Sequence, residues 1–273
     1  MAETLIQKFN RIFSRIISAM SRNKKDNALA AAQSKLQKEI AKIFIKQGKL
    51  FIEQFDVFQI RFKESITGDE LNRLFNNVEA ITNESFIDPL NTAYQSSLFQ
   101  GANEISKLLG EDVISFNLSN QRANDWIIDN GAKLVTNVNE TTRFRIKTVV
   151  RNGVKEGLSY DKIAANITKR YKEFAIGKPQ LHIRSRAHLV AITETGNAYE
   201  AGAREGAKQA NDAGLTMEKK WSTTGDNRVS ELCLVNEDES WIGLDQVFAS
   251  GHDRPLRFPG CRCAALYRRR KTN

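Results

Sequence analysis

Residues 181–210 read LHIRSRAHLVAITETGNAYEAGAREGAKQA, and this stretch predicts a long helix that is rich in small residues. It separates two kinds of sequence pattern. Before it, apolar residues recur at helical spacing, and after it short segments have the patterns of strands and turns. We therefore expect a predominantly helical chain with a small mixed part after this helix.

The segments that follow this helix predict a small sheet with a short helix. MEKKWSTT (217–224) is typical of a strand, and GDNRVSELC (225–233) of a turn and a short helix. SWIGLDQVF (240–248) is mostly a loop, and CRCAALYRR (261–269) is typical of a closing strand. We expect the first and the last of these segments to pair.

The segments before residue 181 predict an extended helical region. A turn and an N-cap are expected at SITGDE (65–70), with acids in the first turn of the next helix. Another helix is expected after Ser159, and NKKDN (23–27) is expected to interrupt the first two helices. The phenylalanines of this region are expected to pack between helices. The remaining expected helices span residues 5–20, 27–58, 69–84, 89–109, 120–135 and 138–155.

The composition is ordinary for a folded protein, with 41% hydrophobic and 27% charged residues among 273. No apolar run approaches the roughly 20 residues that span a bilayer, and the amphipathic N-terminus does not resemble a secretory signal. The three cysteines make no disulfide framework and indicate synthesis in a reducing cytosol.

The net charge of +9 is concentrated in two basic clusters. Residues 1–25 carry six basic side chains against Glu3, and the second cluster is Arg268, Arg269, Arg270 and Lys271. Such clusters favour phosphate backbones or acidic protein surfaces, although ordinary solvated surface charge is the alternative.

The N-terminal segment 5–20 predicts an amphipathic helix. One face carries an apolar stripe that includes Phe9, Ile12, Phe13 and Ile16, and the other face carries Lys8, Arg11 and Arg15. This helix is expected either to dock on a partner or membrane surface or to be a first core helix.

The ordered pieces GLSYDKIAANI, RAHLVAITETGNAYEAG, KKWSTTGDNRVSELCLVNEDE and FPGCRCAALY resemble the C-terminal domain of the Mu F-like minor head proteins of tailed bacteriophages. Together they cover roughly residues 145–268. The resemblance implies a predominantly α, α+β fold. We expect three parts: a basic amphipathic helix (1–25), a helical region (26–140) and a Mu F-like α+β domain (141–273).

The same resemblance implies a structural zinc site, from which this sequence departs at two positions. Ser230 stands where a first cysteine is expected, and Phe258 where a histidine is expected. Cys233, Cys261 and Cys263 remain, with His252 as a candidate fourth ligand. A disulfide from Cys233 to Cys261 or Cys263 is an alternative.

The pattern favours a third interpretation, in which the cysteines are buried free thiols that act as small hydrophobes. After the turn at Pro259 and Gly260, strand alternation places Cys261 and Cys263 on one face and Arg262 on the other. We expect the three cysteines to pack near Trp221, so that PGCRC is a structural closure with no cofactor.

No arrangement of residues predicts catalysis, so we expect no enzymatic activity and no small-molecule substrate. The histidines have no catalytic motif context, and no phosphate-binding loop is present. Glu194 is expected to anchor the GDNR turn through a hydrogen bond. Asp226 and Arg228 are expected to clamp that turn, and NEDE (236–239) to form a solvated acidic turn.

The resemblance implies a minor capsid protein inside the virion near the portal vertex, made in the cytoplasm of the bacterial host. It would assist head morphogenesis and DNA packaging or ejection. The expected partners are the portal protein, the major capsid or scaffold protein and packaged double-stranded DNA. One alternative is an ejected nucleic-acid-binding protein with little portal contact. Another is a nuclease or ADP-ribosyltransferase toxin, although the few residues after Cys263 leave no room for an appended toxin.

Overall fold

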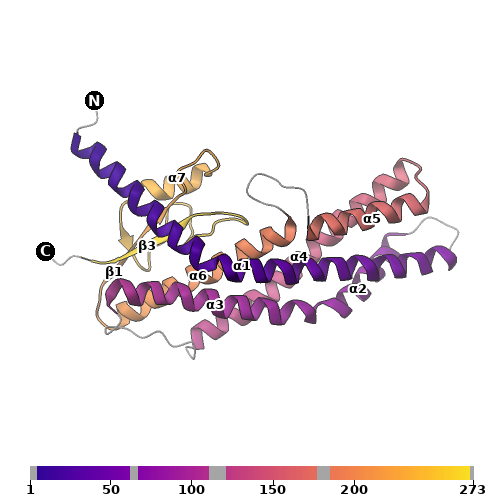
Figure 1. Ribbon diagram of the computed structural model, residues 1–273, viewed down its shortest axis with the longest axis horizontal. Helices are drawn as coiled ribbons and strands as arrows, with labels where there is room; N and C mark the ends of the chain where they lie inside the picture. Colours follow the sequence, from indigo (N-terminus) through magenta and orange to yellow (C-terminus); the bar gives the residue numbers. More distant parts are fainter. Residues whose placement is uncertain (1–4, 62–66, 111–120, 177–184, 271–273) are drawn as a thin grey trace. The chain divides into compact units, whose positions relative to one another are not determined.

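The computed structural model describes residues 5–61, 67–110, 121–176 and 185–270. Within these ranges the side chains of residues 5–23, 57–61, 121, 123, 132 and 160 lie outside the description. The described chain is mostly helical and carries one small antiparallel sheet (Figure 1), so the predicted fold class is confirmed.

Six helices precede the first strand, and α7 lies between β1 and β2 near the C-terminal end of the described chain (Figure 1). The helices are α1 (Leu5–Arg61), α2 (Gly68–Thr82), α3 (Glu84–Leu109), α4 (Gln121–Lys155), α5 (Tyr160–Ala175), α6 (Arg186–Asp212) and α7 (Glu231–Asp238). The strands are β1 (Met217–Ser222), β2 (Ile242–Gly243) and β3 (Ala264–Arg269).

Two predicted helix breaks are wrong. The expected interruption at residues 23–27 lies inside α1, a single helix of 57 residues. Its polar run includes Lys25, whose side chain is buried and bonded, so tertiary contacts hold this turn in the helix. The expected break near residues 136–137 likewise lies inside α4. The N-cap prediction is confirmed at Thr67, which forms a reciprocal capping box with Glu70.

The chain forms two compact units, each built from separate segments. Unit 1 consists of residues 1–33, 93–124 and 192–273, and unit 2 of residues 34–92 and 125–191. α1 and α4 pass through residues 25 and 140 without a break. The division of the sequence at these two positions stays a prediction.

Unit 2 has an aromatic core. The rings of Phe51 and Phe75 lie 5.0 Å apart and those of Phe44 and Phe174 lie 5.7 Å apart, and all four are buried. Tyr171 packs against Phe174 at 5.6 Å between ring centroids. As expected, these rings pack between helices.

In unit 1, α3 and α6 cross at glycines. A Cβ atom on Gly101 would collide with the carbonyl oxygen of Tyr199, and one on Gly202 with the carbonyl oxygen of Leu98. Because backbone touches backbone at this crossing, both positions require glycine. The small residues of α6 therefore serve a close helix contact.

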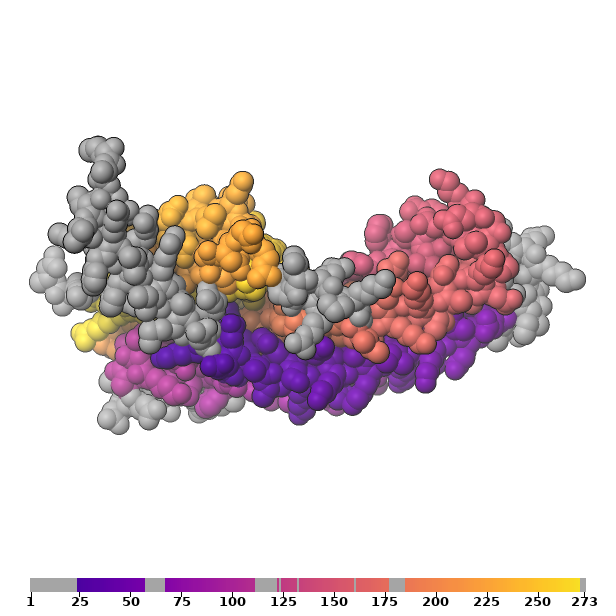
Figure 2. Space-filling model, turned by 45° about the horizontal axis from the view of Figure 1, so that its top comes forward, coloured from indigo at the N-terminus to yellow at the C-terminus, as the bar shows by residue number. Residues whose placement is uncertain are grey.

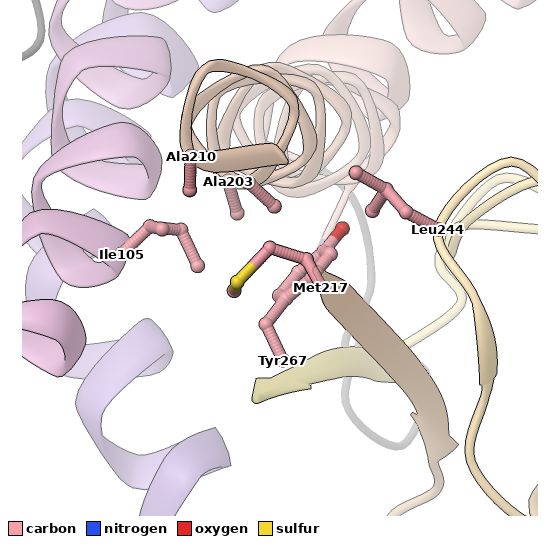
Figure 3. Close-up of a cluster of buried hydrophobic side chains, with 7 residues drawn as sticks. Ile105, Ala203, Ala210, Met217, Leu244 and Tyr267 are labelled. Carbon is pink, nitrogen blue, oxygen red and sulfur yellow. The ribbon is translucent and has the colours of Figure 1, made fainter. Parts of the chain in front are cut away.

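The sheet of unit 1 has the strand order β2-β1-β3 and is antiparallel. Trp221 of β1 lies opposite Ala265, and Lys219 opposite Tyr267, which confirms the expected pairing of these strands. Figure 3 shows side chains of the sheet converging with those of α3 and α6. This buried cluster consists of Ile105, Ala203, Ala207, Ala210, Met217, Leu244 and Tyr267.

We predict that Gly202→Ala lowers the free energy of unfolding by about 3 kcal/mol or more, because the added methyl group separates α3 from α6. Urea denaturation followed by circular dichroism measures this change. Gly68→Ala is the matched control, since nothing lies within 4 Å of the added atom. It should raise stability by about 0.5 kcal/mol. Equal stability of the two variants would contradict the tight crossing.

Candidate functional site

The segment around Cys261 and Cys263 lies against α6 in unit 1. The backbone N–H of Gly260 donates to the Thr193 hydroxyl at 3.0 Å, and that of Ala265 donates to a Glu200 carboxylate oxygen at 3.1 Å. Gly260 has φ 79°, a left-handed conformation that glycine adopts without strain. Two α6 side chains thus fix the segment on both sides of the cysteine pair.

A buried ion pair connects three elements at this point. Lys25 of α1 donates to Glu200 of α6 at 2.6 Å and to the carbonyl oxygen of Cys263 at 2.9 Å. The Glu200 side chain is 1% exposed, so burial raises the pKa of its carboxyl, and Lys25 counteracts part of that rise. No local pattern indicates this pair, because its partners are separated by 175 positions.

The three cysteines form one buried cluster. Their sulfur atoms all lie within 4.8 Å of one another, and they pack with Trp221 and Phe248. Cys233 comes from α7, where the Ser230 hydroxyl caps the helix by accepting from the Cys233 N–H at 3.4 Å. The predicted packing of the cysteines near Trp221 is confirmed.

The cluster favours one thiolate, on Cys261. The pKa of Cys261 lies below its usual range, mainly because the Cys263 thiol donates to it, with further donation from the backbone N–H groups of Cys263 and Arg257. The same contact and burial raise the pKa of Cys263. A second thiolate would be buried beside the first, which Coulomb repulsion disfavours.

The residues present do not supply a four-ligand zinc site. Among the described residues, no histidine or carboxylate joins the three sulfur atoms. The expected fourth ligand, His252, is outside the group, and its Nδ1 atom lies 3.0 Å from the carbonyl oxygen of Ser250. The Ser230 hydroxyl also accepts from Arg257 at 3.2 Å, and Phe258 is 38% exposed. No disulfide joins the cysteines in this structure.

Asp226 forms a clamp on the turn after β1. It accepts from the N–H and guanidinium of Arg228 at 3.1 and 3.2 Å, as predicted. Arg262 adds a bond of 2.7 Å, and this bond is the main reason why the pKa of Asp226 is lowered. Arg262 therefore ties the closing segment to the turn.

The prediction for Glu194 is wrong. Its carboxylate accepts from the Tyr94 hydroxyl of α3 at 2.8 Å instead of binding the GDNR turn. Burial raises the pKa of Glu194 to about 7. Because α3 and α6 are in contact here, the hydrogen-bond donor is Tyr94, which is 100 positions away in the sequence.

The acidic segment 236–239 is also more than a solvated turn. Buried Asn236 exchanges two hydrogen bonds with Ser250, at 2.8 and 3.0 Å. Glu237 accepts from the N–H of Thr223 at 2.8 Å, and Glu239 accepts from the N–H of Ala249 at 3.0 Å. These side chains bind nearby loops. α7 itself lies at the surface, where its orange atoms are visible in Figure 2.

The C-terminal basic cluster is partly engaged. Arg268 pairs with Glu218 at 2.8 Å and lies 4.3 Å above the ring of Trp241. Arg270 lies 3.6 Å from Glu218, and Arg269 is exposed. Lys271 lies outside the described residues.

The N-terminal stripe lies in the part of α1 whose backbone alone is described. The side chains of Phe9, Ile12, Phe13 and Ile16, and of Arg11 and Arg15, are therefore outside the description. Their role in partner binding stays a prediction.

Comparison with known proteins gives one match. A family model described as Phage Mu protein F like protein matches residues 145–266. This stretch runs from α4 to β3 and contains the cysteine cluster, the Asp226 clamp and Glu200. Searches of curated proteins and of solved structures found no match. Within the described ranges, no helix is long and apolar enough to cross a membrane.

We predict that Cys233→Ser lowers the free energy of unfolding by about 1–3 kcal/mol, because a hydroxyl replaces a buried thiol. Elemental analysis of wild-type protein purified without chelator should find no stoichiometric zinc, and added chelator should leave its melting temperature unchanged. One zinc per chain, lost together with the fold on chelation, would contradict this prediction.

We predict that Glu194 makes stability fall as pH rises. Its folded pKa of about 7 lies above the ordinary value of 4.5, so between pH 4.5 and 7 the folded state keeps a proton that the unfolded state loses. From pH 4.5 to 8, wild type should lose about 2–3 kcal/mol relative to Glu194→Gln. Urea denaturation of both proteins at several pH values measures the difference, and parallel pH profiles would exclude the raised pKa.

Proposed function

We propose that the chain is a minor head protein of a tailed bacteriophage, because residues 145–266 match the model of the phage Mu protein F-like family. The match to this family model supports a head-related role in a phage and a location in the virion. The proposal adds a position inside the capsid near the portal vertex and a role in head morphogenesis.

We propose that the protein acts by binding and has no catalytic activity. The observation that supports this is that the buried thiol and carboxyl groups of the matched stretch form hydrogen bonds within unit 1. Cys261 is hydrogen-bonded within the cysteine cluster, Glu194 accepts a hydrogen bond from Tyr94, and Glu200 accepts one from Lys25. Each of these groups is buried and holds two parts of unit 1 together. This supports a stable structural protein more than a toxin with nuclease or ADP-ribosyltransferase activity.

The proposed partners are the portal protein and the major capsid or scaffold protein, with packaged DNA as a further partner. The basic amphipathic pattern of residues 5–20 supports docking on an acidic portal surface. The structure gives less support to a protein that acts mainly on DNA. Arg268, from the cluster expected to bind phosphates, already pairs with Glu218.

We predict that replacing Phe13 and Ile16 together by Ala yields heads that lack the protein, because a partner loses two apolar anchors. Immunoblotting of purified heads measures incorporation. The double substitution leaves Lys25 intact, so the buried pair with Glu200 is kept. The control replaces Gln7 and Ser14, which lie off the apolar stripe, by Ala and should be incorporated normally. Normal incorporation of both variants would remove this docking hypothesis.

A further inference from the structure

β3 is an edge strand, because the sheet order is β2-β1-β3. The ladder shows which of its backbone groups face away from β1. The backbone N–H of Arg270 donates to the carbonyl oxygen of Thr216, so the even-numbered residues form the backbone hydrogen bonds with β1. The N–H of Ala265 donates to Glu200 instead. The N–H and C=O groups of Ala265, Tyr267 and Arg269 therefore face outward.

The first part of this outer edge is closed by side chains. The Lys25 ammonium group donates a hydrogen bond to the carbonyl oxygen of Cys263, and the N–H of Ala265 donates a hydrogen bond to the Glu200 carboxylate. Two groups that would otherwise bond an added strand are thus satisfied by a buried ion pair. An edge that is blocked in this way does not accept a partner strand at residues 263–265.

The second part of the edge is open among the described residues. No hydrogen bond from the described part of the chain reaches the outward backbone groups of Tyr267 or Arg269. A groove of about 830 Å³ lies along this strand. Its apolar wall is formed by α3, α6, β3 and the segment at Trp241, through Ile105, Leu108, Ala203, Trp241 and Leu266.

Basic side chains surround the open part. Lys24 and Lys107 line the groove, and Arg269 is the last residue of β3. Arg270 follows β3 and lies 3.6 Å from Glu218. Glu104 is the acid among the described residues that line the groove, and it lies 3.8 Å from Lys107. A second copy of β3 would place arginines against arginines, so like charge disfavours pairing between copies. The charge favours an occupant that carries carboxylates.

We infer that the edge of β3 at residues 267–269 accepts an extended segment of another head protein as an added strand. That segment alternates apolar residues, which enter the groove, with acidic residues, which meet Arg269 and Lys24. The backbone bonds give affinity and the groove gives specificity. The inference rests on the proposed function, because it supplies the contact through which the protein is held in the head.

Hydrogen–deuterium exchange of free protein and of protein in assembled heads tests the edge directly. The peptide covering residues 264–270 should exchange at least about tenfold more slowly in heads, because the added strand bonds the outward N–H groups. Equal exchange in the two states would overturn the inference. Absence of the wild-type protein from heads would overturn the proposed function as well.

Two substitutions at one position separate backbone pairing from charge. Arg269→Pro removes an outward N–H that β1 does not use, and Arg269→Ala keeps the N–H while it removes the charge. Incorporation into heads should fall at least about tenfold for the proline variant and less for the alanine variant. The melting temperature shows that both variants fold. If the proline variant does not fold, the exchange experiment decides alone, and full incorporation of a folded proline variant overturns the inference.

Discussion

The ion pair between Lys25 and Glu200 is the interaction on which unit 1 depends. It joins α1 to α6, and through Cys263 and Ala265 it also joins both helices to the closing segment. Removing one partner of a buried pair costs about 3–5 kcal/mol, because the other charge stays buried. Such a pair adds little as a mere attraction. Its main effect is on geometry. The Glu200 carboxylate receives both of its hydrogen bonds only when α1, α6 and β3 are all in their observed positions.

The small residues of α6 make this geometry possible. Gly202 follows Glu200 by two positions, and at Gly202 the backbone of α6 touches that of α3. The close crossing brings Tyr94 within bonding distance of Glu194. A bulkier residue at position 202 would separate the helices and leave that carboxyl without its donor. Small side chains on α6 thus allow the buried contact between Glu194 and Tyr94.

The sequence predicts the elements of the site better than their contacts. Periodicity and turn residues indicate β1, β3, α7 and the turn at Asp226, because these signals are local. The closing segment packs near Trp221 as expected, although Cys261 and Cys263 precede β3, which begins at Ala264 and not at residue 261. Two of the errors involve distant partners. Lys25 resembles solvated charge within NKKDN, and Glu194 bonds a tyrosine 100 positions away. Local pattern does not encode such contacts.

The contacts around the cysteines explain how the closing segment can be held without a four-ligand metal. Four successive points are fixed by other means: Gly260 by Thr193, Arg262 by Asp226, Cys263 by Lys25 and Ala265 by Glu200. A structural metal stabilises a loop by cross-linking distant parts of the chain. These hydrogen bonds cross-link the same segment to α1, α6 and the turn after β1.

The two departures from the pattern that the Mu F-like resemblance implies are consistent with this arrangement. Ser230, which stands in place of a first cysteine, is engaged as the cap of α7 and as an acceptor for Arg257. The three thiols are then left to fill the space between α7, Trp221 and Phe248, where small polarisable side chains pack well. The bonds that flank the cluster fix the position of β3. They therefore also decide which part of its outer edge is closed and which part remains open.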